Sequence, residues 1–378
     1  MEINTNIENN YEFQDIIKLF IPINFEEYDI IVNHVLEEKE DKIYNYYKII
    51  NQKTEYEYEK VSDKNEFISS NAFAKIGLYE ILSKIFNKTM PYGALTGIRP
   101  VKFCYDLFKK GLPKTSIQNF LINNYHVSLE KTQLIIDIII NQKNLELNDK
   151  LVDFYVNIPF CTSRCNYCSF ISMETSKAGK LIDEYVEKLI YEIEKTKKFL
   201  MENYFIVKSV YIGGGTPTAL SVEQLEKVLQ SVSFKVKEFT VEAGRPDTIT
   251  KEKLDLLQKY NVTRISINPQ TFNDNVLKAI GRKHTAMEAL NAYKLARTYN
   301  FDINMDLIMG LSKDTIKSFG ETMDIATFLA PDNITVHTLA LKRGSSLKEN
   351  NENIFKNENR VKKMANIAKT TLTNAGYK

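Results

Sequence analysis

The sequence predicts an α/β protein in two parts: an α+β N-terminal domain over residues 1–150 and a partial (β/α)6 TIM-like barrel that begins at residue 151. Two observations predict this division. From Val152 onward, short apolar strands alternate with amphipathic helices, which favours a parallel sheet with right-handed crossovers. Before that point, strand-like runs come first and helical patterns follow them. Eight βα units would complete a closed barrel, whereas six leave an open, curved sheet.

Composition and charge describe an ordinary globular chain. The shares of hydrophobic (43%) and charged (26%) residues among 378 exclude a wholly disordered or collagen-like chain. The 50 basic residues nearly cancel the 48 acidic ones, so we expect neither nucleic acid nor an anionic membrane as a partner. Apolar stretches such as residues 134–140 are too short to span a bilayer, and the N-terminus lacks a secretion signal. We therefore expect a cytoplasmic protein.

The N-terminal domain is expected to begin with strands and continue with helices. Short runs of β-branched and aromatic residues, separated by polar breaks, predict strands at residues 16–25, 28–35, 43–50 and 55–61. Apolar residues at helical spacing predict helices at residues 72–86, 101–110, 117–124 and 129–141. Between the first two helices, the glycines and prolines of residues 91–100 predict a loop.

The barrel is expected to cover residues 151–345. Its strands are predicted at residues 152–158, 207–212, 239–242, 264–267, 303–308 and 334–340. Helices are predicted between them at residues 180–200, 223–230, 285–299 and 315–329. A last helix is expected at residues 353–375, followed by Gly376. Because the chain stops where this helix has just ended, we expect residues 346–378 to be the start of an incomplete C-terminal region.

Three of the four cysteines lie within eight residues, directly after the first barrel strand. Cys161, Cys165 and Cys168 have the spacing C-x3-C-x2-C, so their thiolates can converge on one centre. An iron–sulfur cluster, a zinc site and a chance grouping are all open readings of this pattern. Structural zinc takes four protein ligands, and Cys104 stands far away in a predicted helix, where we expect a core residue. A [4Fe–4S] cluster with three cysteine ligands keeps one iron open for chemistry.

The run Tyr155-Val156-Asn157-Ile158-Pro159-Phe160-Cys161, with the two further cysteines, resembles the radical SAM superfamily. Within it, the chain resembles the oxygen-independent coproporphyrinogen III oxidase group. That group has a tyrosine six residues before the first cysteine and an aromatic residue just before the third, here Tyr155 and Tyr167. The resemblance covers residues 152–378. It implies a barrel of the radical SAM type, in which Cys161, Cys165 and Cys168 hold a [4Fe–4S] cluster whose fourth iron is open to S-adenosylmethionine.

Further motifs of this group follow in strand order. The second strand ends in Gly213-Gly214-Gly215-Thr216, and glycines of this kind let the backbone approach a ligand closely. Taken singly, each remaining polar residue reads as an ordinary group near a strand end. Jointly, their order and intervals resemble the family's pattern. The resemblance implies that S-adenosylmethionine is contacted by Tyr155, Tyr167, Gly214, Gly215, Thr216, Glu242, Gln270, Arg282, Asp306 and, through its backbone, Ala340.

The resemblance also implies an activity, that of an oxidoreductase of porphyrin and haem biosynthesis. In this group, a 5′-deoxyadenosyl radical derived from S-adenosylmethionine takes hydrogen from a propionate β-carbon of coproporphyrinogen III. Loss of one electron and CO2 leaves a vinyl group, and a second round gives protoporphyrinogen IX. The implied electron donor is a flavodoxin or a ferredoxin. No residue is assigned a catalytic role beyond the cofactor site.

Two positions depart from the oxidase pattern. The classical oxidase has a fourth cysteine two residues after the third, where this chain has Phe170, and Asn157 replaces a common histidine. The same loss of the fourth cysteine occurs in relatives that resemble haem chaperones. The sequence therefore supports a second reading, a haem-binding or haem-delivery protein that keeps the cluster. A zinc-binding structural protein is a third reading.

The loop at residues 92–100 resembles one in the N-terminal extension of the HemZ-type coproporphyrinogen dehydrogenase branch of this group. Arg99 offers a guanidinium suited to a substrate carboxylate. The plainer reading, which we prefer, is a turn before a helix that begins at Pro100. Members of the group continue well beyond a segment like Ala375-Gly376-Tyr377, which agrees with the expectation of a truncated copy.

Overall fold

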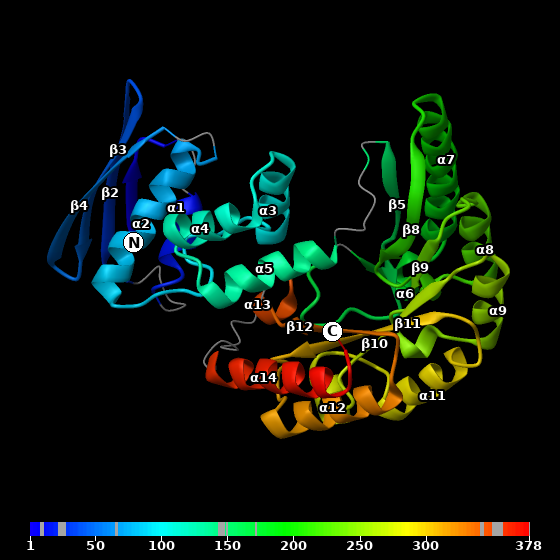
Figure 1. Cartoon of the computed structure of the whole chain (residues 1–378). Coiled ribbons are helices and arrows are strands. Elements are labelled where there is room, and N and C mark those ends of the chain that lie inside the picture. The colour runs from blue at the N-terminus through cyan, green and yellow to red at the C-terminus, as the bar shows by residue number, and fades with distance from the viewer. Residues whose placement is uncertain are drawn as a thin grey trace. The chain divides into compact units, whose positions relative to one another are not determined.

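The computed structural model describes residues 1–7, 11–21, 28–64, 67–142, 148, 150–170, 172–340, 344–349 and 358–377 (Figure 1). The chain divides into two compact units, Met1–Glu146 and Leu147–Lys378. None of the helices within the described ranges is both long and apolar enough to cross a membrane.

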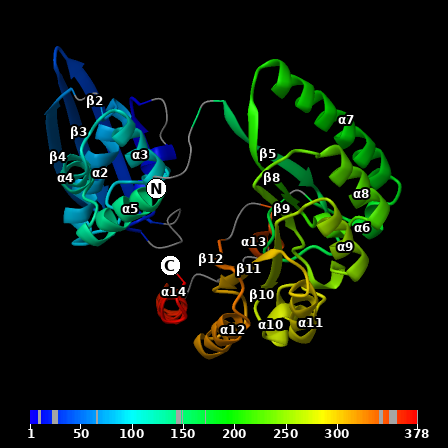
Figure 2. The ribbon, with the colours of Figure 1, turned by 45° about the vertical axis from the view of Figure 1, so that its right-hand side comes forward.

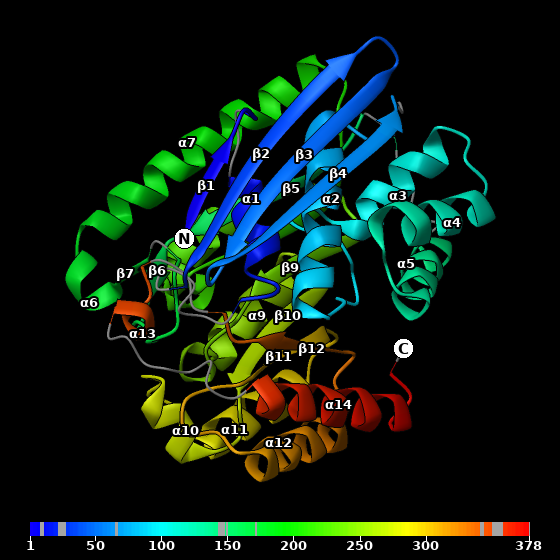
Figure 3. The same ribbon diagram turned by 90° about the vertical axis from the view of Figure 1, so that its left-hand side faces the viewer.

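The first unit contains a four-stranded sheet with helices packed against it. Strand β1 (Glu2–Thr5) pairs in parallel with β2 (Ile30–Lys39), which continues in antiparallel pairing to β3 (Lys42–Asn51) and β4 (Thr54–Asp63). Figure 3 shows these strands side by side, with α1 (Tyr11–Ile17) and α2 (Ser70–Phe86) behind them. The other helices are α3 (Pro100–Lys109), α4 (Lys114–Tyr125) and α5 (Leu129–Asn141).

One predicted strand of this unit is wrong. The segment 16–25 was expected to be extended, but Ile16 and Ile17 end helix α1, and residues 22–25 lie outside the described part of the chain. Phe13, Ile16 and Ile17 are all fully buried and have the i, i+3, i+4 spacing of one helical face. Burial of that face outweighs the strand preference of isoleucine. Strand β1 was not foreseen.

The second unit is an open sheet of six parallel strands in the order β12-β11-β10-β9-β8-β5, which confirms the predicted partial barrel. Apart from β5, neighbouring strands follow each other along the chain, as repeated right-handed βα units require. Figure 2 shows the curved sheet with its helices on the outer side. The strands are β5 (Leu151–Ile158), β8 (Ile206–Gly214), β9 (Glu238–Glu242), β10 (Arg264–Gln270), β11 (Asp302–Met309) and β12 (Asn333–Thr338).

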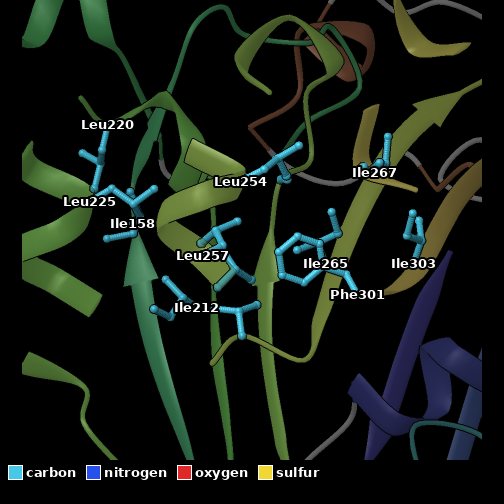
Figure 4. Packing of buried hydrophobic residues seen from close by; sticks show 14 of the residues in the cluster. Ile158, Ile212, Leu220, Leu225, Leu254, Leu257, Ile265, Ile267, Phe301 and Ile303 are labelled. Atoms are coloured by element: carbon cyan, nitrogen blue, oxygen red, sulfur yellow. The ribbon is translucent and has the colours of Figure 1, made fainter. Parts of the chain in front are cut away.

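Alternating side chains give the curved sheet one apolar and one polar face. Ile212, Ile265 and Ile303 are fully buried and belong with Leu254 and Leu257 to one apolar cluster between the sheet and its helices (Figure 4). The covering helices are α7 (Leu181–Glu202), α8 (Val222–Ser231), α9 (Lys251–Lys259), α11 (Ala286–Ala296), α12 (Ile316–Leu329) and α14 (Glu358–Asn374). Because strand residues alternate between faces, the intervening polar and aromatic side chains lie on the concave side.

Helix α14 lies within this packing. It packs against α12 and β11, and its Met364 and Ala368 are buried in the core of the second unit. The sequence assigns this helix to the start of a C-terminal region at residues 346–378, and in the structure the helix contributes to the core of the second unit. Residues 353–357 of the predicted helix lie outside the described residues. Helices α9 and α10 (Asp274–Ala279) were not foreseen.

Candidate active site

A cavity of about 340 Å³ opens where the barrel strands end. The loop that carries Cys161, Cys165 and Cys168, called the cysteine loop below, lines one side of the cavity. Residues at the carboxyl ends of β8 to β12 line the rest. This is the end of a βα barrel where active sites form. The cavity brings together most of the predicted site residues: Cys161, Cys165, Tyr167, Cys168, Gly214, Gly215, Thr216, Glu242, Gln270, Arg282, Asp306 and Ala340. Tyr155 is not part of its lining.

The cysteine loop is held at both ends and at its tip. Strand β6 (Phe160–Cys161) pairs with β7 (Met173–Glu174) and so closes the base of the loop. At the tip, the backbone N–H of Asn166 donates to the Ile280 carbonyl at 3.0 Å, and its side-chain amide donates to the Ala279 carbonyl at 3.1 Å. The loop therefore has a defined shape that depends on the end of helix α10.

The three thiols differ in their surroundings. Cys165 is 7% exposed, whereas Cys161 and Cys168 are partly exposed, and all three are free. Burial raises the pKa of the Cys168 thiol. Among the described residues, no three Cys, His, Asp or Glu side chains form a group that could hold a single metal ion. A [4Fe–4S] cluster is a larger group, in which each cysteine binds a different iron.

The glycine motif, Gly213-Gly214-Gly215-Thr216, packs directly against the cysteine loop. Gly214 has a φ of 108°, and a β-carbon built on it would lie 2.1 Å from Asn157 Oδ1. The backbone N–H groups of Gly215 and Thr216 donate to the carbonyls of Ile158 and Phe160, at 2.8 and 2.7 Å. Gly214 therefore needs to be a glycine, and the two backbone hydrogen bonds tie the end of β8 to the start of the cysteine loop.

Two tyrosines and a carboxylate form a group on the concave face. The Tyr211 hydroxyl donates to Glu242 Oε1 at 2.5 Å, and the Tyr211 ring stacks on Tyr155 with centroids 6.0 Å apart. Burial raises the pKa of Glu242, and the nearby Asp306 carboxylate adds to the increase. Tyr155 is 58% exposed and reaches Glu242 through Tyr211. Sequence reasoning missed Tyr211, although it directly faces Tyr155 in the β5–β8 register.

Arg282 connects three elements around the cavity. Its Nη1 donates to the carbonyls of Gly244 and Asn268, at 3.2 and 3.1 Å, and its Nη2 donates to the Tyr167 hydroxyl at 3.2 Å. Burial raises the pKa of Tyr167 to about 12, so this tyrosine stays neutral. Arg282 therefore braces the ends of β9 and β10 against the cysteine loop.

Several buried polar atoms of the lining have no hydrogen-bond partner within the described part of the chain: Ser163 Oγ, Arg245 Nη1, Asn268 Oδ1, Gln270 Oε1 and Arg282 Nε. A buried polar atom without a partner costs about 1–3 kcal/mol. Gln270 also has a φ of 69°, which is uncommon for a residue with a side chain. Such atoms and strain gather where a polar ligand binds. The lining thus suits a ligand that both donates and accepts hydrogen bonds.

The carboxyl ends of β11 and β12 form a further part of the cavity lining. Asp306 accepts from Asn304 Nδ2 at 2.8 Å and lies 3.9 Å from His337 Nε2. Sequence reasoning did not select His337, Asn268 or Arg245, which also line the cavity. All three are polar and stand at or just after predicted strands, the one signal that could have found them.

Arg99 and Cys104, which the sequence analysis considered, belong to the first unit. Arg99 is exposed at the N-cap of α3, which begins at Pro100 as the plainer reading predicts, and it makes no side-chain cap bond. Cys104 is fully buried in the core of that unit, where burial raises its pKa to about 12.

Comparison with known proteins assigns a large part of the second unit to a known superfamily. Residues 155–326 match the model of the radical SAM superfamily. The chain is 35% identical to the oxygen-independent coproporphyrinogen-III oxidase-like protein HemZ of Bacillus subtilis, over 69% of this chain and 54% of that protein. It is 34% identical to the haem chaperone HemW of the same organism, over 50% of each.

A solved structure supports the assignment to the radical SAM superfamily. Coproporphyrinogen III oxidase (HemN) from Escherichia coli, a radical SAM enzyme, aligns with a TM-score of 0.55 and 27% identity. The alignment covers 60% of this chain and 53% of that one. The chain thus spans about half the length of the relatives it matches.

Proposed function

The chain carries a radical SAM domain, and from this premise we propose that it is an oxidoreductase that decarboxylates coproporphyrinogen III to protoporphyrinogen IX without oxygen. The observation that carries the proposal is the cysteine loop packed against the glycine motif on the wall of one cavity. A radical SAM domain binds a [4Fe–4S] cluster and S-adenosylmethionine.

The residues of the cavity fit both groups. Cys161, Cys165 and Cys168 are free thiols on one loop and would bind three irons, which leaves the fourth open. The unpartnered atoms of Asn268 and Gln270 are acceptors suited to an amino group, and the unpartnered nitrogens of Arg245 and Arg282 are donors suited to a carboxylate. Glu242 and Asp306 are acceptors suited to ribose hydroxyls.

When bound, the cluster and S-adenosylmethionine supply a carbon radical that takes hydrogen from the substrate. The residues of the chain hold the walls of the cavity in place and exclude water from it. Arg282 joins the ends of β9 and β10 to the cysteine loop, and the glycine motif joins the end of β8 to the start of the same loop. Ile308 and Leu339 give the lining an apolar portion that limits water near the reacting atoms.

The substrate assignment is supported by the relatives. The HemZ and HemN proteins carry the name of the coproporphyrinogen III oxidase reaction and match this chain over more than half of its length. A propionate side chain of the porphyrinogen would give a hydrogen atom to the 5′-deoxyadenosyl radical and one electron to an external one-electron acceptor, and it would release CO2 to leave a vinyl group. A flavodoxin or ferredoxin would deliver the electron that starts the reaction.

Anaerobic turnover tests the proposal. The chain, reconstituted with iron and sulfide, is incubated with dithionite, S-adenosylmethionine and coproporphyrinogen III, and the porphyrins are separated by chromatography. We expect 5′-deoxyadenosine and a product with fewer carboxylates. The Cys165→Ala variant serves as the control without a complete ligand set. A protein that binds four irons and cleaves S-adenosylmethionine but leaves the porphyrinogen intact would contradict the substrate assignment.

Haem binding and delivery is the second candidate. Phe170 lines the cavity, is 63% exposed and stands where the classical oxidase has its fourth cysteine. An exposed aromatic ring offers a flat apolar surface to a porphyrin macrocycle. The similarity to HemW haem chaperones agrees with this alternative. Stoichiometric haem binding that weakens in Phe170→Ala, with no porphyrinogen turnover, would favour it over the oxidase.

A further inference from the structure

Arg245 is a buried arginine that contacts the cysteine loop from the third strand of the barrel. It follows β9 and precedes a 3-10 turn at Pro246–Thr248, and it is only 3% exposed. Its Nη2 donates to Cys165 Sγ at 3.2 Å and also to the Ser163 carbonyl. Arg245 and Cys165 stand 80 residues apart in the chain, so the fold creates this contact.

The segment that carries Arg245 is fastened to the loop a second time. Thr162 Oγ1 donates to Asp247 Oδ2 at 3.0 Å, two residues beyond Arg245. The guanidinium cannot easily move away from the sulfur, because Thr162 and Ser163, which lie between Cys161 and Cys165, also hold the two segments together. A carbonyl contact alone would be served equally well by a lysine, whereas the planar guanidinium presents N–H groups in a fixed direction.

The chemical consequence follows from the charge of the sulfur. As an iron ligand, Cys165 is a thiolate, and an arginine is always protonated, so the contact becomes a charge-assisted hydrogen bond. Hydrogen bonds to the sulfurs of a cluster are one of the factors that set its reduction potential. Reduction adds one negative charge to the cluster, and a positive donor beside a ligand sulfur stabilises the reduced form more than the oxidised one.

We propose that Arg245 is a positioning residue that raises the reduction potential of the [4Fe–4S] cluster through its bond to Cys165. This inference rests on the proposed function, because it requires the cluster. The redox step is the transfer of one electron from an external one-electron reductant to the 2+ cluster, which becomes the 1+ cluster. No bond within the protein forms or breaks.

The test compares matched arginine variants in the full chain. Arg245→Met removes the donor and the charge, and Arg245→Lys keeps the charge. Arg164→Met is the control, since Arg164 belongs to the same loop and donates to the Gly344 carbonyl at 2.8 Å. It removes an equal charge without taking a hydrogen bond from sulfur. Each protein is reconstituted, assayed for iron and sulfide, and titrated with dithionite while the reduced cluster is followed by electron paramagnetic resonance.

We expect a lower midpoint potential in Arg245→Met than in the wild type and in Arg164→Met. The potential of Arg245→Lys should lie between that of Arg245→Met and that of the wild type. Equal potentials in Arg245→Met and Arg164→Met would overturn the inference. A wild-type protein that holds no four-iron cluster would instead overturn the proposed function, so the two failures are distinct.

A second measurement covers the case in which Arg245→Met fails to hold a cluster. Wild-type protein labelled with ¹⁵N-arginine is reduced and studied by pulsed electron paramagnetic resonance. We expect a weak coupling between the cluster spin and a guanidinium nitrogen, retained in labelled Arg164→Met. Absence of this coupling in a protein with an intact, reduced cluster would contradict the contact itself.

Discussion

Gly215 and Cys161 are so close that a β-carbon built on Gly215 would lie 3.0 Å from Cys161 Sγ. The same β-carbon would lie 2.5 Å from the Phe160 carbonyl oxygen, which is backbone and cannot turn aside. The absence of a side chain at this position is therefore a requirement of the cysteine loop. Gly215 therefore constrains the position of Cys161, one of the three proposed cluster ligands, as well as the cavity that it lines.

Gly215→Ala is expected to disturb the cysteine loop. The added methyl group should push Cys161 from its position, at a cost of about 1–3 kcal/mol, and iron content after reconstitution should fall well below that of the wild type. Iron and sulfide assays with circular dichroism measure both effects. Gly320→Ala is the matched control, because a β-carbon on Gly320 meets nothing within 4 Å. Wild-type iron content in Gly215→Ala would contradict the prediction.

Single alanine variants of Cys161, Cys165 and Cys168 are each expected to lose the iron–sulfur absorption, since two thiolates cannot hold three irons. Cys104→Ala is the control. Its sulfur is fully buried in the core of the first unit, so this variant should keep the wild-type cluster and lose only about 1 kcal/mol of stability. Iron-to-protein ratios settle the comparison. Loss of iron in Cys104→Ala would show that the fourth cysteine takes part.

Arg282→Lys is expected to weaken binding of S-adenosylmethionine by about tenfold, equivalent to 1.4 kcal/mol. A single ammonium group cannot bridge Gly244 and Asn268 while reaching the Tyr167 hydroxyl, so the cavity wall should loosen. Equilibrium dialysis on the reconstituted protein gives the dissociation constant. Lys283→Met, at the exposed next residue, should bind as the wild type does. Equal affinity in Arg282→Lys and Lys283→Met would contradict the bracing role.

The stability of the first unit is expected to depend on pH through Glu80. This carboxylate accepts from the Tyr58 hydroxyl, Lys60 Nζ and His126 Nε2, each at 2.6 Å. Burial alone would raise the pKa of Glu80, but the three hydrogen bonds outweigh burial and lower it from 4.5 to about 2. The contribution of Glu80 to the free energy of unfolding is therefore complete above pH 4.5 and is lost as the pH falls toward 2.

Glu80→Gln tests this dependence. We expect the variant to be less stable near neutral pH by roughly 2 kcal/mol and to lose less stability than the wild type on acidification. Urea denaturation followed by circular dichroism at several pH values measures both quantities. Glu59→Gln, on the exposed side of β4, is the control. If the two variants had the same pH profile, Glu80 would not be the responsible group.

Patterns that are local in the chain were predicted well. The alternation of apolar strands and amphipathic helices indicated six parallel strands, because burial on a sheet depends on period-2 spacing that the sequence displays directly. The spacing of Cys161, Cys165 and Cys168 is also local in the chain, and it predicts a loop on which three thiolates can converge. The predicted strand at residues 16–25 failed because a short run of isoleucines fits either element, and only packing decides between them.

The sequence by itself thus determined the class of fold, the cysteine loop and the strand ends that face one cavity. Only the tertiary structure decided which side chains meet there. It placed Tyr211 on Glu242, Arg282 on two carbonyls and Arg245 on Cys165, and it made Tyr155 an indirect neighbour of the cavity. These partners come from different strands and loops, and their contact depends on register and sheet curvature. Spacing along a single chain does not record either quantity, since both arise from the packing of all six strands together.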